Sequence, residues 1–494
     1  RKKGVSSVGE RGSRDLRFAI IGSGMAGILS AVKLEEEGLT DFTVYEKADR
    51  VGGTWRENTY PGLSCDVPSH LYCYSFARNP DWSHFFSPGY EIQAYFERVV
   101  DEYKLAPHIR FGDEVVSCSF DDGRWKISTR SGHRDEVDVV IAATGVLHHP
   151  KYPDIEGLEC FEGALFHSAR WDHDVLLEGA RVGIIGTGST SVQIVSAIVD
   201  RVQQLSLFQR TAQWIMPATN PEYDASEKRS FRENPQLIAD LRAATSQLYD
   251  MFSSAVVDAG SAQIKGIEEA CKANLVNSVV DPALRERLRP DYRAACKRLI
   301  VSTDFYEAIQ KPNAELVTEP IEAVETKGVR TTDGVLRELD VLVLATGFAV
   351  DAFVRPMSVE GRNGVKLDDV WADRPEAYLS ISVPDFPNFF MLNGPNGPVG
   401  NFSLVEVAEL QVGYIMSLVD RLRSGECREI APTEAALREF ESARVQAAKK
   451  TVWASGCRSW YLDDRGVPAV WPWPFERFRV EMSTPDWTAY EFCG

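Results

Sequence analysis

The chain has 494 residues, more than one ordinary hydrophobic core contains, so we expect two or three domains. A hydrophobic fraction of 44% and a charged fraction of 26% are typical of globular proteins and argue against extensive disorder or a coiled coil. Asp and Glu (72) outnumber Lys and Arg (54), and the formal charge of −18 argues against nucleic-acid and anionic-membrane partners, which need a positive face.

The N-terminus superficially resembles a signal peptide. Basic residues within positions 1–17 precede an apolar run at residues 18–34, but glycines interrupt that run. Nowhere does the chain reach the roughly 18 uninterrupted apolar residues that a membrane span requires. We therefore expect no targeting or membrane-spanning segment, a cytoplasmic protein, and a flexible lead over residues 1–15.

The nine cysteines are odd in number, scattered, and form no C-x-x-C pair. This pattern argues against a disulfide framework and against zinc-ribbon spacing, and it fits a reducing cytosol. It also disfavours a pyridine-nucleotide disulfide reductase, which needs a redox C-x-x-C. We predict no metal site.

A strand, a glycine-rich turn and a helix form the first predicted unit. Its parts are a strand at residues 18–21, the glycines Gly22, Gly24 and Gly27, and a second strand at residues 42–45 that ends at Glu46. Such glycine spacing alone arises by chance about 0.2 times in a chain of this composition, but the flanking elements and the acid about twenty residues later favour a dinucleotide site. Gly22 permits the turn, and Gly24 lets the backbone approach a pyrophosphate. Gly27 packs helix on strand, and Glu46 would accept from ribose hydroxyl groups.

A second unit of this kind starts at residue 181. Its parts are a strand at residues 181–185, the turn Gly186, Thr187, Gly188 and Ser189, a helix at residues 192–199 and a strand at residues 205–209. It differs from the first in two ways, because Ser191 replaces the third glycine and Arg210 replaces the acid. A cation there would bind a 2′-phosphate, so this site is predicted to prefer NADPH over NADH.

The rest of the chain extends these two units. Strands are predicted at residues 299–302 and 314–317, and two strands lead into Ala-Thr-Gly turns, at residues 137–145 and 339–347. Between residues 220 and 290 the β-branched runs give way to helical spacing. We therefore predict an α/β fold of two nested Rossmann-like dinucleotide-binding domains with a helical insertion.

The most specific motif lies between the two units. It consists of Phe161, Gly163, His167, Trp171 and Asp172. Its first four residues would coincide in about 0.0006 of chains with this composition. The motif matches F-x-G-x-x-x-H-x-x-x-W-(P/D), the fingerprint of Baeyer-Villiger monooxygenases, and the chain resembles this family along nearly its whole length.

The resemblance implies a reaction and its cofactors. Members of the family are class B flavoprotein monooxygenases that carry FAD and use NADPH. They insert one oxygen atom of dioxygen next to a ketone carbonyl, through a peroxyflavin intermediate, to give an ester or lactone. The implied domains are FAD-binding at 16–145 and 350–494, NADP-binding at 146–220 and 293–349, and the insertion at 221–292.

The resemblance also implies residue roles. Arg298 is the expected catalytic cation, because a permanently charged guanidinium stabilises anions without exchanging its proton. Asp66 would hold Arg298, and Lys297 would join Arg210 at the 2′-phosphate. His167 and Trp171 are expected to couple NADPH binding to domain rotation rather than to act as bases. Besides the three glycines and Glu46, the expected cofactor contacts are Gly53, Thr54, Trp55, Asp66, Val115, Gly186, Thr187, Gly188, Ser189, Ser191, Arg210, Lys297, Thr346 and Gly347.

Two alternatives stay open. A group B monooxygenase that oxidises nitrogen or sulfur is disfavoured by Trp171 and Asp172, since those relatives usually carry Tyr or Phe in the fingerprint. A catalytically inactive dinucleotide-binding protein is disfavoured by the retained Asp66, Lys297 and Arg298.

The substrate is the least defined part of the prediction. The helical insertion and the aromatic tail suggest a small apolar ketone, and residues 471–474 line either a substrate tunnel or the core. We expect a monomer or a weak homo-oligomer.

Overall fold

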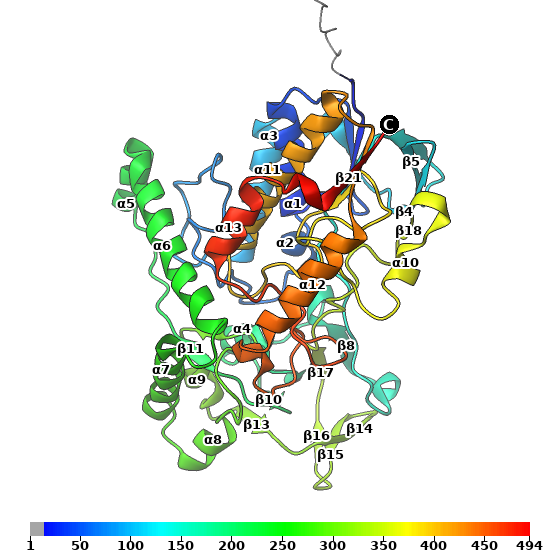
Figure 1. Cartoon of the computed structure of the whole chain (residues 1–494). Coiled ribbons are helices and arrows are strands. Elements are labelled where there is room, and N and C mark those ends of the chain that lie inside the picture. Colours follow the sequence, from blue (N-terminus) through cyan, green and yellow to red (C-terminus); the bar gives the residue numbers. More distant parts are fainter. Residues whose placement is uncertain (1–13) are drawn as a thin grey trace, which may run out of the picture.

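Two five-stranded parallel sheets form the framework of the molecule (Figure 1). The computed structural model describes residues 14–494, so the predicted lead lies almost wholly outside the described residues. The first sheet has the order β19-β7-β1-β2-β3 and comprises β1 (Phe18–Ile21), β2 (Phe42–Tyr45), β3 (Ile109–Arg110), β7 (Val139–Ala142) and β19 (Phe389–Met391). All four residues of β1 are buried, as expected for a parallel sheet covered on both faces.

The second parallel sheet has the order β13-β10-β9-β17-β8. It comprises β8 (Ala164–His167), β9 (Arg181–Ile185), β10 (Gln204–Phe208), β13 (Ala314–Val317) and β17 (Val341–Leu344). The crossover helices of the two sheets are α1 (Met25–Glu36) and α4 (Ser189–Ile198). These sheets confirm the predicted α/β class with two Rossmann-like units.

Helix α4 starts earlier than predicted. The apolar periodicity indicates a start near Val192, whereas the helix begins at Ser189, directly after Gly188. Apolar spacing does not reveal the polar first turn of a helix. That turn carries the free N–H groups that a phosphate would meet.

Smaller sheets, mostly antiparallel, extend this framework. One contains β4 (Val115–Asp121), β5 (Arg124–Thr129), β6 (Arg134–Val137) and β18 (Ser358–Glu360). Another contains β14 (Ile321–Glu325), β15 (Gly328–Thr331) and β16 (Leu336–Glu338), at the bottom of Figure 1. The strands β11 (Ile215–Pro217) and β12 (Ile300–Ser302) pair with each other, as do β20 (Glu429–Pro432) and β21 (Tyr490–Cys493).

Residues 221–292 are helical, as predicted. They form α5 (Ala225–Glu233), α6 (Pro235–Val256), α7 (Ala262–Ser278) and α8 (Pro282–Arg287), on the left of Figure 1. The other helices are α2 (Thr54–Glu57), α3 (Gly89–Glu102), α9 (Phe305–Ile309), α10 (Leu367–Val370), α11 (Leu404–Arg423), α12 (Glu434–Ala448) and α13 (Phe475–Ser483).

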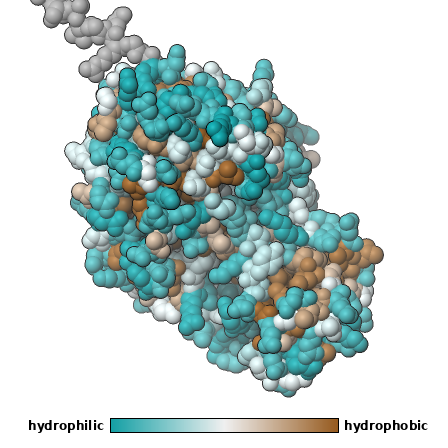
Figure 2. All heavy atoms as spheres, turned by 90° about the vertical axis from the view of Figure 1, so that its right-hand side faces the viewer, coloured by the Kyte–Doolittle hydropathy of each residue, from teal (hydrophilic) through white to brown (hydrophobic). Residues whose placement is uncertain are grey.

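The aromatic tail packs in the core. Trp471 is fully buried, and its ring contacts Trp473, Phe440 and Phe478. Of the two possibilities left open for residues 471–474, core packing therefore holds for Trp471. Figure 2 shows one face of the molecule, hydrophilic over most of its area with apolar residues gathered on its lower part. Among residues 14–494, no helix combines the length and apolar character needed to cross a bilayer.

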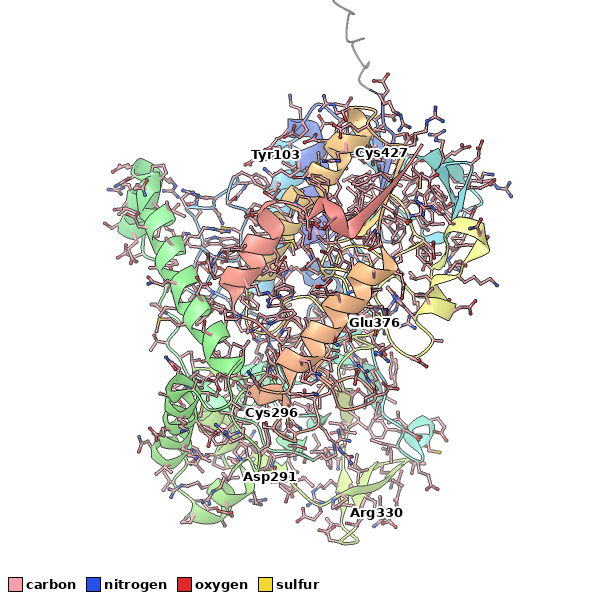
Figure 3. The ribbon with its side chains drawn as sticks, viewed as in Figure 1. Tyr103, Asp291, Cys296, Arg330, Glu376 and Cys427 are labelled. Carbon is pink, nitrogen blue, oxygen red and sulfur yellow. A yellow bond between two sulfur atoms is a disulfide. The ribbon has the colours of Figure 1, made fainter. Side chains whose placement is uncertain are left out.

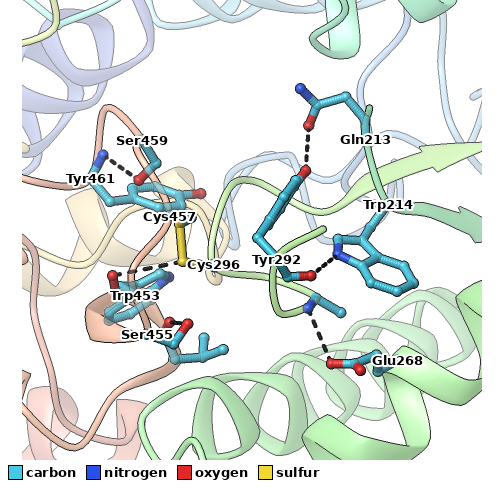
Figure 4. The surroundings of a disulfide bond; sticks show 12 residues. Gln213, Trp214, Glu268, Tyr292, Cys296, Trp453, Ser455, Cys457, Ser459 and Tyr461 are labelled. Atoms are coloured by element: carbon cyan, nitrogen blue, oxygen red, sulfur yellow. Dashed lines mark hydrogen bonds between the residues drawn. A yellow bond between two sulfur atoms is a disulfide. The ribbon is translucent and has the colours of Figure 1, made fainter. Parts of the chain in front are cut away.

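One cysteine pair departs from the expectation drawn from the sequence. Cys296 and Cys457 form a disulfide, whereas the other seven cysteines are free (Figure 4). The expected absence of disulfides is wrong for this pair. The two residues are 161 positions apart, so only the fold brings them together. Cys296 lies below the C-terminal end of α12 (Figure 3).

Candidate active site

The first glycine-rich turn leaves no room for side chains. Gly22 has φ of +100°, and a Cβ there would lie 2.5 Å from the carbonyl oxygen of Ala143, in the first Ala-Thr-Gly turn. A Cβ at Gly27 would lie 1.8 Å from the carbonyl oxygen of Gly22. Gly24 faces Gly53, where a Cβ would lie 2.9 Å from the Gly24 Cα. Backbone is therefore exposed to a ligand at the N-terminal end of α1.

A cavity of about 200 Å³ opens beside this turn. Its lining includes seven of the residues predicted to contact FAD, which are Gly22, Gly24, Glu46, Gly53, Thr54, Trp55 and Val115. Gly27 lies beneath the turn and acts through packing. The glycine cradle, the helix N-terminus and this cavity together fit a bound dinucleotide.

Glu46 is buried and held by protein donors. Its Oε2 accepts from the backbone N–H and the hydroxyl of Ser23, at 3.0 and 2.7 Å. Its Oε1 accepts from the N–H of Ala48 at 2.9 Å and lies 3.2 Å from the Arg56 guanidinium. These contacts fix the carboxylate at the edge of the cavity, and its contact with a ribose stays a prediction.

The second turn repeats the arrangement of the first. Gly186 has φ of +115°, and a Cβ there would lie 2.2 Å from the carbonyl oxygen of Ala345, in the second Ala-Thr-Gly turn. The hydroxyl of Thr187 donates to the carbonyl oxygen of Thr211 at 2.9 Å, which ties the turn to the residue after Arg210. Ser191, at the position of the missing glycine, is fully buried.

Arg210 and Lys297 influence each other's charge although they are far apart in sequence. Burial lowers the pKa of Lys297, and the nearby charge of Arg210 lowers it further. Arg210 is exposed, and the Lys297 ammonium lies 5.0 Å from the centre of the Tyr292 ring. Two like charges repel each other, and an anion between them would relieve that repulsion. The pair therefore suits the 2′-phosphate of NADPH.

A larger cavity, of about 870 Å³, adjoins Arg210. Residues from both Rossmann-like units and from the loop after α12 line it, among them Lys151, Phe353, Asn393, Trp460 and Tyr461. Arg210 is the predicted NADPH contact that lines this cavity.

Arg298 and Asp66 form a close ion pair. Both Nη2 and Nε of Arg298 donate to Oδ2 of Asp66, at 2.6 and 3.1 Å. The charge of Asp66 raises the pKa of the Arg298 guanidinium and outweighs burial, which lowers it. Arg298 therefore stays charged throughout the physiological pH range.

The surroundings of this pair are aromatic, which the sequence motifs did not reveal. Tyr249 of α6 donates to the backbone carbonyl of Asp66 at 3.1 Å. Tyr72 lines the smaller cavity and accepts from the indole N–H of Trp55 at 3.1 Å. Neither Asp66 nor Arg298 is itself among the residues that line the two cavities.

Comparisons with known proteins identify this arrangement. The family model described as Flavin-binding monooxygenase-like matches residues 15–226. An uncharacterised monooxygenase of Mycobacterium tuberculosis is 49% identical, with 94% of each chain covered. A Baeyer-Villiger monooxygenase of Streptomyces coelicolor is 40% identical, with 96% of this chain and 92% of the relative covered. This chain belongs to the Baeyer-Villiger monooxygenase family.

A solved structure agrees with this assignment. The crystal structure of cyclohexanone monooxygenase from a Rhodococcus species, bound to NADP+, has a TM-score of 0.86 and 31% sequence identity, and the match covers 97% of this chain and 99% of that one. FAD and NADPH are the cofactors of this Baeyer-Villiger monooxygenase. The α/β class and the two Rossmann-like units predicted from the sequence are confirmed.

His167 of the Baeyer-Villiger fingerprint has a structural environment. Its Nδ1 accepts from the N–H of Ala169 at 3.1 Å, and its Nε2 lies 3.1 Å from the carbonyl oxygen of Gly347. Burial lowers the pKa of His167, which favours the neutral ring with a proton on Nε2. Because both nitrogens are engaged, His167 is placed to fix the second Ala-Thr-Gly turn rather than to act as a base.

A chain of ion pairs links the fingerprint to the FAD side. Arg170 lies 2.7 Å from Glu57, and Glu57 lies 2.6 Å from Arg56. Arg56 in turn contacts Glu46. Arg56, Glu57 and Arg170 could not be predicted from the sequence, because each is a common surface type and only the fold aligns them.

The cation pair gives a prediction about coenzyme choice. We expect Arg210→Ala to raise the KM for NADPH by about tenfold or more and to leave the KM for NADH almost unchanged, because only NADPH carries the 2′-phosphate. Steady-state kinetics with both coenzymes measure this. Equal losses for the two coenzymes would contradict the 2′-phosphate role.

Proposed function

We propose that this Baeyer-Villiger monooxygenase acts on a small apolar ketone, with Arg298 as the cation at the reacting centre and Asp66 as the residue that positions it. The observation that carries this proposal is the Arg298–Asp66 ion pair, at 2.6 Å. The product is the corresponding ester or lactone.

FAD, reduced by NADPH, supplies the activated dioxygen from which one atom is transferred. Negative charge develops on the ketone oxygen as the new C–O bond forms. The guanidinium of Arg298 is placed to stabilise that charge, because its proton is not lost and Asp66 fixes its plane. Asp66 binds one edge of the guanidinium through Nε and Nη2, which leaves Nη1 for the substrate side.

The lining of the larger cavity supports an apolar substrate. Phe353, Leu404, Trp460 and Val470 contribute apolar surface to it. Arg210 and Lys151, in the same wall, suit the phosphates of NADPH. A ketone would therefore lie against the aromatic part of the wall, away from these cations.

We also propose the domain division and the oligomeric state predicted above. The FAD-binding domain comprises 16–145 and 350–494, the NADP-binding domain 146–220 and 293–349, and the insertion 221–292. The first and second parallel sheets, which fall in the two proposed domains, support this division. We propose a monomer or a weak homo-oligomer, which sedimentation across a range of protein concentrations tests.

A ketone panel tests the substrate class. Linear, monocyclic, aryl and steroid ketones are incubated with the holoenzyme and NADPH, and esters are measured by mass spectrometry. We expect ester from one or more apolar ketones. Oxidation confined to amines or sulfides, with no ester from any ketone, would contradict the proposal.

A further inference from the structure

One helix of the insertion contacts the loop that presents Asp66. Helix α6 lies beside α13 (Figure 1), and the hydroxyl of its Tyr249 donates to the backbone carbonyl oxygen of Asp66 at 3.1 Å. Burial raises the pKa of Tyr249, so the hydroxyl keeps the proton that it donates. The carboxylate of Asp66 accepts from Arg298, so Tyr249 and Arg298 hold the same residue by two different groups.

The main chain around Asp66 has few other partners. In the part of the chain that the structure describes, Tyr249 is the only group that donates to the Asp66 carbonyl. The next N–H along the chain, that of Val67, donates to the Sγ of Cys65 at 3.4 Å, and sulfur is a weak acceptor. The Tyr249 hydroxyl therefore fixes a peptide group that the loop itself holds only weakly.

The same face of α6 makes a second contact with this loop. Arg242 lies two helical turns before Tyr249, so both side chains leave the helix on one side. The Nη1 of Arg242 donates to the carbonyl oxygens of Cys73, Leu71 and His70, at 2.7, 3.2 and 3.3 Å. Helix α6 therefore binds the loop at residue 66 and again at residues 70–73.

The helix is itself fixed to the proposed FAD-binding domain. Asp250, the neighbour of Tyr249 in the chain, binds Arg479 of α13 at 2.9 Å. Arg479 also lies 3.1 Å from Glu406 of α11, whose carboxylate accepts from the hydroxyl of Ser246 at 3.1 Å. Because these contacts join α6 to both α11 and α13, the Tyr249 hydroxyl has a rigid support.

We propose that Tyr249 is a positioning residue for Asp66 and, through the Asp66 carboxylate, for Arg298. Asp66 accepts both hydrogen bonds from Arg298 at one oxygen, Oδ2, so a shift of the Asp66 main chain moves the guanidinium with it. The helical insertion thereby takes part in the reaction through the place of the cation. This inference rests on the catalytic role proposed for Arg298.

Tyr249→Phe removes the hydroxyl and keeps the ring. We expect the rate of ester formation to fall about fivefold, the effect of losing one hydrogen bond between neutral groups, with a larger share of the NADPH consumed giving hydrogen peroxide. Ester and peroxide come from the same enzyme molecules, so their ratio does not depend on how much of the protein is folded. The rate of flavin reduction and the KM for NADPH should stay within about twofold of wild type, because the second glycine-rich turn and Arg210 are unchanged.

Tyr414→Phe is the matched control. Tyr414 is a buried tyrosine of α11 whose hydroxyl pairs with that of Tyr490 at 2.9 Å. This variant also loses one buried hydroxyl, and we expect it to keep the wild-type ratio of ester to peroxide. A wild-type ratio in Tyr249→Phe would overturn the proposal, as would an equal shift of the ratio in Tyr414→Phe.

A double variant tests whether Tyr249 acts through Asp66. Asp66→Ala keeps the carbonyl that Tyr249 binds and removes the carboxylate that holds Arg298. In that background Tyr249→Phe should change the ratio of ester to peroxide by less than about twofold, because the place of the Asp66 main chain no longer affects the cation. A further loss as large as in the wild-type background would overturn the proposal.

Arg298→Ala separates this inference from the proposed function. If Arg298→Ala loses ester formation and Tyr249→Phe keeps the wild-type ratio, the inference fails and the function stands. If Arg298→Ala keeps ester formation, the catalytic role itself fails.

Discussion

Arg298→Ala should lower ester formation by about 10²–10³-fold, the usual cost of removing a donor that stabilises charge in the transition state. Flavin should still be reduced by NADPH, because the glycine-rich turns and the Arg210–Lys297 pair are unchanged. Dioxygen is then consumed as hydrogen peroxide. Reduction can slow to some extent, since the same cation can help to position the nicotinamide. Stopped-flow reduction, peroxide assay and ester yield measure the three quantities separately.

Two further variants sharpen this result. Arg298→Lys should rescue little, because a compact ammonium cannot reproduce the planar pairing with Asp66. Asp66→Ala should be milder than Arg298→Ala, since it misplaces the cation without deleting it. If Arg298→Ala makes ester at near the wild-type rate, the reacting cation lies elsewhere in the chain.

Gly27→Ala should prevent FAD binding and destabilise the fold. A methyl group there would lie 1.8 Å from the carbonyl oxygen of Gly22, and a backbone atom cannot move aside as a flexible side chain can. We expect a loss of about 3 kcal/mol in the free energy of unfolding, typical of overpacking in a tight site. Flavin absorbance of the purified protein and denaturant unfolding measure the two effects.

Gly413→Ala is the control for this variant. Gly413 lies in α11, where an added Cβ would have no atom within 4 Å apart from the backbone of its own helix. Alanine there should be neutral or stabilise by up to about 1 kcal/mol, because glycine is costly inside a helix. If Gly27→Ala bound FAD as well as Gly413→Ala does, the packing role of Gly27 would be wrong.

The two Rossmann-like units could be predicted because their signals are local. Buried strands, glycine turns and the residue after the second strand all lie within short windows, so Gly22, Gly186 and Arg210 stand out without a structure. The sequence also carries a local signal for a hairpin. The hairpin β4–β5 turns at Asp122 and Gly123, an Asp-Gly pair typical of two-residue hairpins.

The rest depends on contacts between distant segments. Tyr249 comes from the helical insertion, far from Asp66 in sequence, so it has no motif. Cys296 and Cys457 look like isolated thiols in the sequence, and the expectation of no disulfide failed there. Packing of the tail against α12, and not periodicity, decides that Trp471 belongs to the core.

Oxygen isotope labelling shows whether the oxygen atom inserted next to the carbonyl comes from dioxygen. The holoenzyme is incubated with NADPH, an accepted ketone and ¹⁸O₂ in ordinary water, and the ester is analysed by mass spectrometry. We expect the ester to carry one new ¹⁸O atom, in the ring or chain next to the former carbonyl carbon. Unlabelled ester, or hydrogen peroxide as the sole fate of ¹⁸O₂ with every ketone, would contradict this expectation.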